Sequence, residues 1–261
     1  MKLDGRTVLI TGASQGIGAA TARAFAASGV RLALLARSSD RLQALADELN
    51  RVPGVQALPV VADIGQKDEV VKAVARVEQV LGPVDILVNN AGVGMRSPVG
   101  DMDLMTAQQV FTVNFWGAIH CIEAVLPAMR ARGDGLIINI SSIIGRRAMP
   151  HAAIYCASKF AINALSESLR LELHPDNVRV VTFYPGVTRT EFSRNELSGD
   201  ASNYSRNRAP KTPVEDTAKA IVRASQREPR DAYATLFDRV FVCGATLAPG
   251  LMDRMLLRFY R

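Results

Sequence analysis

Tyr155 and Lys159 stand four residues apart in a segment, 154–173, whose apolar residues recur with helical period. On a helix, residues at this spacing share a face, so the phenol and the ammonium can act together. A phenol titrates at about pH 10, and a neighbouring ammonium favours the phenolate and lowers that pKa. Ser142 lies thirteen residues before Tyr155, and its hydroxyl could hold and polarise a substrate oxygen. These three residues predict proton transfer at a carbonyl or a hydroxyl.

A glycine-rich turn, Thr11-Gly-Ala-Ser-Gln-Gly-Ile-Gly18, comes after the first predicted strand and leads directly into a predicted helix. Glycine permits a close approach of the backbone, and the N–H groups at a helix start attract anions, so this turn suits a pyrophosphate. Its spacing is Gly-x-x-x-Gly-x-Gly, which differs from the Gly-x-Gly-x-x-Gly dinucleotide fingerprint. A plain strand-to-helix turn is the alternative, but such a turn needs only one glycine.

The second predicted strand ends at Ala36-Arg37-Ser38, without a carboxylate. In a dinucleotide-binding fold this position meets the adenosine ribose, where an acid accepts from a 2′-hydroxyl and an arginine favours a 2′-phosphate. We therefore predict NADP(H) as the preferred cofactor, with NAD(H) as the alternative. Arg37 as a solvated surface residue is the competing interpretation.

Short runs rich in leucine or β-branched residues alternate with longer segments of helical period, which is typical of a parallel sheet with crossover helices. The predicted strands are Thr7–Thr11, Leu32–Ala36, Gln56–Val61, Ile86–Val88, Leu136–Ser141 and Val178–Tyr184. The predicted helices are Gly16–Ser28, Asp40–Asn50, Lys67–Leu81, Ala107–Arg130, Ile154–Leu173 and Val214–Glu228. Continuously apolar strands indicate burial on both faces. We expect one α/β domain over residues 1–261, a Rossmann-like doubly wound parallel sheet in a three-layer α/β/α sandwich.

The composition, with 48% hydrophobic and 21% charged residues among 261, is typical of a globular protein and excludes disorder and collagen. The formal net charge is +6, and residues 201–261 hold eleven Lys and Arg against six Asp and Glu. Five of the six surplus charges therefore lie in that region. It lacks the aromatic interleaving of a nucleic-acid interface, so we expect no nucleic-acid partner.

The three cysteines lie far apart and the three histidines show no metal-like spacing, so neither a disulfide framework nor a metal site is expected. The start of the chain lacks the pattern of a signal peptide. No run reaches the roughly 20 apolar residues of a membrane span. The longest charge-free run near the C-terminus, Val240–Met252, has about 13. We expect a cytoplasmic protein without a transmembrane span.

Several motifs along residues 5–190 occur in one order, and together they resemble the short-chain dehydrogenase/reductase family. They are Thr11-Gly12 with Gly16-Ile17-Gly18, Asp63-Ile64, Asn89-Asn90-Ala91-Gly92, Asn114 in Val-Asn-Phe, Ser142 in Ile-Ser-Ser, Tyr155-x-x-Ser-Lys159, and Pro185-Gly186-x-x-x-Thr190. The resemblance implies an NAD(P)-dependent oxidoreductase that interconverts a carbonyl and a secondary alcohol, so the expected partner is a small molecule.

The resemblance also implies roles for individual residues. Tyr155 would exchange the proton, and Lys159 would lower its pKa and bind the ribose hydroxyls. Ser142 would orient the carbonyl, and Asn114 would hold a proton-relay water. The residues implied to contact the cofactor, together with Arg37, are Gly12, Ser14, Gln15, Gly16, Ile17, Gly18, Asp63, Ile64, Asn90, Ala91, Gly92, Tyr155, Lys159, Pro185, Gly186, Val187, Thr188 and Thr190.

Alternatives stay open at four places. Asn114 could cap or kink its helix, and Asp63 could cap the helix after it. Ser141 competes with Ser142, and only the spacing to Tyr155 favours the latter. Trp116 is expected in the core.

The substrate pocket is expected to come from residues 94–99, residues 143–151 and a lid of about 186–213. Apolar residues in these segments indicate a nonpolar or mixed substrate. His151 could line this pocket, but we expect it at the surface.

The C-terminal segment, about 236–261, departs from the family pattern of a closing strand with a Gly-rich, acidic tail. It resembles a branch that includes membrane-associated and steroid- or lipid-directed reductases. Apolar residues with interspersed charges fit an interfacial helix pair. We expect subunit packing in a homodimer or homotetramer, with peripheral contact to a membrane as the alternative.

Two further functions compete with carbonyl reduction. One is an NADP(H)-binding regulator without turnover, although a sensor has no need of the phenol and the ammonium. The other is an epimerase or dehydratase on the same fold, which would show no net cofactor oxidation.

Overall fold

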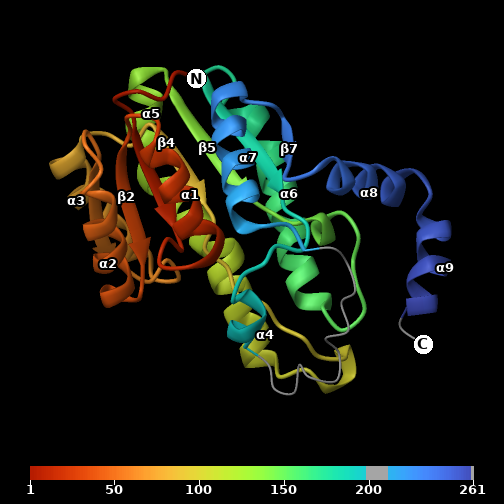
Figure 1. The fold of residues 1–261 in the computed structure, drawn as a ribbon. Coiled ribbons are helices and arrows are strands. Elements are labelled where there is room, and N and C mark those ends of the chain that lie inside the picture. Colours follow the sequence, from red (N-terminus) through yellow and green to blue (C-terminus); the bar gives the residue numbers. More distant parts are fainter. Residues whose placement is uncertain (198–210, 260–261) are drawn as a thin grey trace.

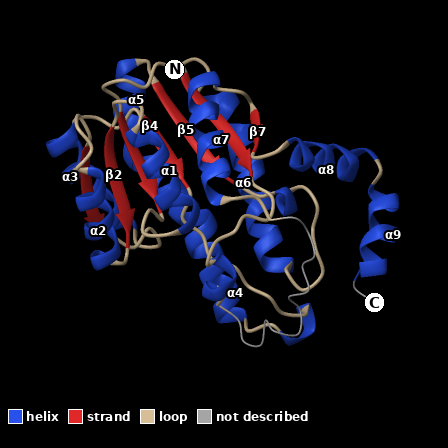
Figure 2. Cartoon of the chain, viewed as in Figure 1, coloured by secondary structure: helices blue, strands red, loops and turns tan. Residues whose placement is uncertain are grey.

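Seven parallel strands form one sheet in the order β3-β2-β1-β4-β5-β6-β7 (Figures 1 and 2). The computed structural model describes residues 1–197 and 211–259. The strands are β1 Thr7–Thr11, β2 Arg31–Ala36, β3 Gln56–Val61, β4 Ile86–Asn89, β5 Gly135–Ile140, β6 Val178–Tyr184 and β7 Asp231–Tyr233. The helices are α1 Gly16–Ala26, α2 Ser39–Leu49, α3 Lys67–Leu81, α4 Leu104–Phe111, α5 Gly117–Arg132, α6 Ala153–Glu172, α7 Val214–Arg227, α8 Leu236–Leu247 and α9 Pro249–Phe259.

The expected three-layer sandwich is confirmed by the way successive residues of a strand face opposite layers. In β1, Val8 and Ile10 belong to the cluster beneath α1, α2 and α7, whereas Leu9 belongs to the cluster beneath α3, α5 and α6. Because both faces are covered by helices, the inner strands need no polar face, and all residues of β1, β4 and β5 are buried.

The strand order reverses between β1 and β4, which lie side by side although two strands separate them in sequence. The chain leaves β1 toward β2 and leaves β4 toward β5, so the connections diverge at the carboxyl ends of this pair. A crevice opens where crossovers diverge, and ligands of doubly wound sheets bind there. The glycine-rich turn after β1 and the segment after β4 both lie at this place.

The sequence-based boundaries need three corrections. The expected absence of a closing strand is wrong, since β7 pairs in parallel with β6 over three residues. The single helix expected over Ala107–Arg130 is α4 and α5, joined by a π-helical turn at Thr112–Trp116. The fifth strand is Gly135–Ile140, one residue earlier at each end than expected, although Ser141 N still donates to the carbonyl of Phe183 in β6 at 2.8 Å.

The C-terminal helices α8 and α9 project from one side of the sandwich (Figure 1), and they meet at a bend of 114°. By length and composition alone this pair, and separately the helical stretch Leu104–Arg132, could cross a membrane. The second stretch contains α5, whose Cys121, Ile122 and Val125 are packed in the core of the sandwich. Burial against the sheet accounts for part of its apolar character, since 39% of its most apolar 18 residues are buried.

Candidate active site

A cavity of about 750 Å³ opens at the carboxyl edge of the sheet, where the strand order reverses. Of the catalytic and cofactor-binding residues predicted from the sequence, all but Gly18 and Asn114 line it. Gly18 lies behind the wall, because a Cβ there would fall 2.3 Å from the carbonyl oxygen of Gly12. The fold therefore brings together residues from the whole length 12–190.

The glycine-rich turn is clamped to the segment after β4 by hydrogen bonds. Thr11 Oγ1 accepts from the backbone N–H groups of Asn90 and Ala91, each at 3.0 Å. The side-chain amide of Asn90 donates back to the carbonyl of Thr11 at 2.9 Å. Gly12 has φ +65°, and a Cβ there would fall 2.8 Å from Ala91 Cα, so only glycine fits. The two backbone segments thus form a narrow, side-chain-free floor.

At one end of the cavity lie two arginines. Arg37, predicted from the sequence, is exposed and its guanidinium lies 4.0 Å from the Asp63 carboxylate. Arg41, in the first turn of α2, donates to Gln15 Oε1 at 2.5 Å and lines the same cavity. Arg41 was not among the residues predicted from the sequence, although a second arginine four residues after Arg37 could have indicated it. Together the arginines make this end strongly attractive to an anion.

At the other end lie the three residues predicted to carry the chemistry. Ser142 and Tyr155 both line the cavity, and the Ser142 hydroxyl lies near enough to the phenol to act on its pKa. Lys159 Nζ lies 5.7 Å from the centre of the Tyr155 ring and donates to the carbonyl of Ile140 at 2.9 Å. Ser141 also lines the cavity, but its hydroxyl is occupied by donation to the carbonyl of Lys159 at 3.3 Å. The structure therefore favours Ser142 over Ser141 as Tyr155's partner.

The pKa values of this group differ from the sequence-based expectation. Burial raises the pKa of Tyr155 above its ordinary value, and the neighbouring Ser142 hydroxyl opposes that rise. Burial lowers the pKa of Lys159 to about 8. The ammonium was expected to lower the pKa of Tyr155, but desolvation dominates because both groups are enclosed by the fold.

Asn114 lies in the π-helical turn and is buried. Its Oδ1 accepts from the backbone N–H of Val93 at 2.8 Å, and its Nδ2 donates to the carbonyl of Val93 at 2.9 Å. The same Nδ2 donates to Ser158 Oγ at 3.0 Å. The alternative of a helix irregularity at Asn114 is thus observed, and the side chain connects the segment after β4 to the helix that carries Lys159.

The segment 185–190 forms the wall opposite the glycine-rich turn. A Cβ at Gly16 would lie 3.5 Å from the Thr190 side chain, so the two segments face one another closely. Gly186 has no room for a side chain, because a Cβ there would fall 2.0 Å from the Asp238 carboxylate. Asp238 lies in the first turn of α8, within a capping box with Thr235. The C-terminal segment therefore supports one wall of the cavity.

The substrate end differs in part from the expected pocket. Gly94, Met95 and Arg96 line the cavity, whereas residues 97–99 do not. Ile143, Ile144 and Met149 also line it, but residues 145–148 and His151 do not. The expected lid over 186–213 contributes residues 186–188, 190–192, 195–197 and 211, and its residues 198–210 lie outside the described part of the chain.

Two of the open alternatives are resolved by the structure. Trp116 was expected in the core but is 52% exposed, because the π-helical turn rotates it outward. Asp63 does not cap α3, since its Oδ1 accepts from Gly65 N at 2.9 Å and the N-cap position is held by Gln66. Within residues 1–197 and 211–259, no group of three or more His, Cys, Asp or Glu is arranged to hold a metal ion.

Comparison with known proteins agrees with this geometry. A family model described as short chain dehydrogenase matches residues 6–201. The dehydrogenase/reductase SDR family member 7B of Bos taurus is 34% identical over 259 residues, which cover 95% of this chain and 79% of the relative.

Solved structures show the same similarity. A short chain dehydrogenase/reductase of Burkholderia phymatum in complex with NAD has a TM-score of 0.87 at 25% identity, covering 97% of this chain and 96% of that one. A short chain dehydrogenase of Burkholderia cenocepacia in complex with NADP has a TM-score of 0.82 at 29% identity, covering 98% of this chain and 99% of that one.

Proposed function

The chain belongs to the short chain dehydrogenase family and is a nicotinamide-dependent oxidoreductase, and on this premise we propose that it interconverts a carbonyl and a secondary alcohol with NADP(H). One observation carries the proposal. Ser142, Tyr155 and Lys159 line the same cavity as the glycine-rich turn and the Arg37 guanidinium. Proton-transfer groups at one end and anion-attracting groups at the other fit an elongated dinucleotide that ends beside the phenol.

The shape of the floor supports the cofactor assignment. At Gly12 and Gly18 a Cβ would collide with backbone atoms, so neither position can carry a side chain. The backbone at the start of α1 is therefore open to a pyrophosphate. Arg37 and Arg41 would hold the 2′-phosphate that distinguishes NADP(H) from NAD(H). When bound, the cofactor supplies or accepts the hydride. NAD(H) is the alternative cofactor. Arg37 and Arg41 are the residues that would discriminate between NADP(H) and NAD(H).

The chain's own groups would manage the proton and the orientation of the substrate. Tyr155 would donate its hydroxyl proton to the carbonyl oxygen, and its raised pKa keeps that proton in place until negative charge develops on the oxygen. Ser142 would donate a hydrogen bond to the same oxygen. Lys159, held at Ile140, would bind ribose hydroxyls and stabilise the phenolate that remains. Asn114 would position the α6 residue Ser158 and, through a backbone carbonyl, a relay water.

A substrate-panel assay tests the proposal. Ketones and secondary alcohols of graded size are offered with NADPH, NADH or their oxidised forms, and cofactor absorbance is followed. Turnover with a ratio of kcat/KM for NADPH over NADH well above one supports the proposal. Cofactor binding without any turnover would favour the regulator, and substrate conversion without net cofactor oxidation would favour the epimerase or dehydratase.

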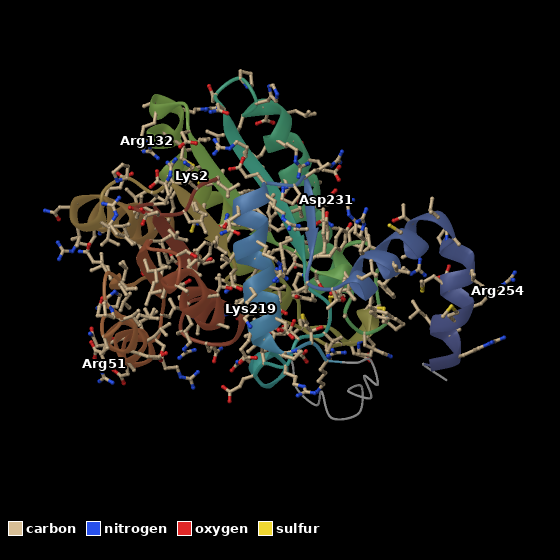
Figure 3. All side chains as sticks on the ribbon, turned by 45° about the horizontal axis from the view of Figure 1, so that its top comes forward. Lys2, Arg51, Arg132, Lys219, Asp231 and Arg254 are labelled. Carbon is tan, nitrogen blue, oxygen red and sulfur yellow. The ribbon has the colours of Figure 1, made fainter. Side chains whose placement is uncertain are left out.

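For α8 and α9 we propose subunit packing in a cytoplasmic homo-oligomer. Leu236, Val240, Cys243 and Leu247 recur at positions i, i+4, i+7 and i+11 of α8, and all four are exposed. This spacing puts them on one face, and an exposed apolar stripe most often marks a protein interface. Arg254 points outward from α9 (Figure 3), so contact with an anionic membrane is the alternative.

The structure decides how that proposal should be tested. Truncation at Thr235 would remove Asp238 and Val242, which pack against Gly186 and Tyr184, and would damage the cavity. The double substitution Val240→Lys and Leu247→Lys changes only the exposed apolar stripe of α8. Sedimentation should show a smaller species for the double variant than for the wild type. Unchanged size with loss of binding to phosphatidylglycerol vesicles would contradict subunit packing and favour the membrane.

A further inference from the structure

Arg96 and Glu196 place a charge pair beside apolar walls at the substrate end of the cavity. Arg96 Nε donates to both carboxylate oxygens of Glu196, at 3.0 and 3.1 Å. The Glu196 side chain is only 6% exposed and that of Arg96 25%. Both residues line the cavity, whose neighbouring walls are Val93, Met95, Ile144, Met149 and Leu197.

The two partners belong to segments that contact each other near Tyr155. The Arg96 segment is held to the α6 side by Ser97 N, which donates to the carbonyl of His151 at 2.8 Å. The Glu196 segment meets it through Leu197 N, which donates to the carbonyl of Gly94 at 2.9 Å. Phe192 of the same segment lies on the Tyr155 ring, with centroids 5.5 Å apart. Glu196 therefore lies in the cavity close enough to the phenol for its charge to act on it.

The pair is a poor device for merely closing an apolar pocket. Removing two charges from water costs free energy that their attraction only partly returns, and an apolar pair of similar volume closes such a gap as well. A ligand that displaced the Glu196 segment would leave the Arg96 guanidinium without this carboxylate. A ligand that carries a carboxylate would bind Arg96 with its own carboxylate in place of that of Glu196.

We propose that Glu196 stands in for a substrate carboxylate, and that Arg96 binds this carboxylate when the substrate enters; the inference rests on the proposed carbonyl–alcohol chemistry. The substrate class is then an oxo-acid or hydroxy-acid with an apolar body. The apolar part contacts the walls, the carboxylate meets Arg96, and the reacting oxygen lies at Tyr155 and Ser142.

The charges that act on Tyr155 agree with this exchange. The carboxylate of Glu196 raises the pKa of Tyr155, and the guanidinium of Arg96 lowers it. Replacement of one carboxylate by another keeps the local charge balance beside the phenol. A neutral substrate in the same position would cost the guanidinium its bonds to the Glu196 carboxylate without replacing them, which lowers the binding free energy.

A binding experiment tests the inference without turnover. Octanoate and 1-octanol are titrated calorimetrically into the enzyme saturated with NADP⁺. The wild type should bind octanoate more tightly than 1-octanol, and Arg96→Met should lower the octanoate-to-octanol affinity ratio by about thirtyfold. Arg96→Lys keeps a positive charge and should retain most of the ratio. Equal ratios in the wild type and Arg96→Met would overturn the inference.

The Glu196→Gln variant distinguishes two roles of this side chain: occupying the position of a ligand carboxylate, or only holding the pocket closed. If Glu196 competes with the ligand, the neutral amide competes less, and octanoate should bind several-fold more tightly while 1-octanol does not. If the pair only holds the pocket closed, both ligands change by the same factor, and that result would contradict the inference.

Turnover supplies the second arm and a matched control. Octanoates with an oxo group at carbon 4, 5, 6 or 7 are compared with their methyl esters, and the acid-to-ester ratio of kcat/KM should fall at least tenfold in Arg96→Met. Arg51→Met, at an exposed arginine outside the cavity (Figure 3), should leave the ratio unchanged. Reduction of esters and acids at equal rates by the wild type would sink the inference alone, whereas no reduction of any ketone, with octanoate binding intact, would sink the proposed function alone.

Discussion

Asn114 Nδ2 donates a hydrogen bond to Ser158 Oγ at 3.0 Å, one residue before Lys159 on α6. The bond joins the π-helical turn between α4 and α5 to the helix that carries Tyr155 and Lys159. A π-turn inserts one extra residue into the helical repeat and rotates the residues after it about the helix axis. Here the extra residue aims Asn114 inward at the segment after β4, so one irregular turn sets the spacing between the cavity floor and α6.

The first prediction concerns this connection. Asn114→Leu removes three hydrogen bonds and leaves the partly buried N–H and carbonyl of Val93 without those partners, so the free energy of unfolding should fall by about 2 kcal/mol. Urea unfolding followed by circular dichroism measures it. Gln79→Leu, an amide on the exposed face of α3, should change the value by less than about 0.5 kcal/mol. Equal effects of both substitutions would refute the structural role of Asn114.

The second prediction concerns the proton donor. Tyr155→Phe keeps the ring that packs on Phe192 but removes the hydroxyl, so kcat should fall by about 10²- to 10⁴-fold. NADPH affinity, measured by quenching of protein fluorescence, should change little, because the glycine-rich turn and Arg37 remain. Turnover within threefold of the wild type would show that another group transfers the proton.

The third prediction rests on the lowered pKa of Lys159, about 8 in the folded protein. An unfolded lysine titrates at about 10.5, so between these values the unfolded chain binds more protons, and stability rises with pH. Below about pH 8 both states are protonated and the full cost of the buried charge is present. From pH 7.5 to 9.5 the wild type should gain roughly 2 kcal/mol relative to Lys159→Met.

The measurement is urea unfolding of both proteins at several pH values within that window. Taking the difference between the proteins cancels the contribution of other titrating groups. A difference that stays constant with pH would mean that Lys159 is charged throughout, and that its burial does not lower its pKa.

The fourth prediction concerns cofactor choice. A double substitution of Arg37 and Arg41 by alanine removes both guanidinium groups at the adenosine end. We expect kcat/KM for NADPH to fall by about 10²-fold and that for NADH by less than about threefold, because only the former loses charge-assisted hydrogen bonds. Equal losses for both cofactors would mean that these arginines support the fold and do not read the 2′-phosphate.

The fifth prediction compares two glycines. Gly186→Ala forces a Cβ against the Asp238 carboxylate, so either the wall segment or α8 must move, and both KM for NADPH and thermal stability should worsen. Gly244→Ala places a Cβ in open space within α8 and should be neutral or stabilising by up to about 1 kcal/mol. Loss of cofactor affinity in the second variant as well would contradict a specific role of Gly186.

Much of the fold could be predicted because short-range patterns decide it. Alternation of buried strands with amphipathic helices requires a parallel sheet covered on both sides, and all six predicted strands occur within two residues of their expected ends. The strand β7 was not predicted, because its three residues, Asp231–Tyr233, are too few to show a pattern and are defined only by their pairing with β6. The break between α4 and α5 was not predicted either, because a π-turn preserves the apolar content of the helix.

The candidate site divides in the same way. The sequence by itself determined which residue types would act, since the glycine-rich turn, Arg37, Ser142, Tyr155 and Lys159 are recognisable from spacing within single strand–helix units. Only the tertiary structure decided which pKa values move and in which direction. Desolvation depends on everything that surrounds a side chain, and for Tyr155 it outweighs the effect of a neighbouring lysine.

Only the tertiary structure, too, brought Arg41 into the cavity and paired Arg96, which lies in a segment expected at the pocket, with Glu196. Arg96 and Glu196 are a hundred positions apart and meet because the loops at the carboxyl ends of β2, β4 and β6 converge on one edge of the sheet. Local sequence patterns carry no record of such convergence, because it is set by strand order. The sequence determined the family and the residue types at this edge, and the packing of the loops decided what surrounds them.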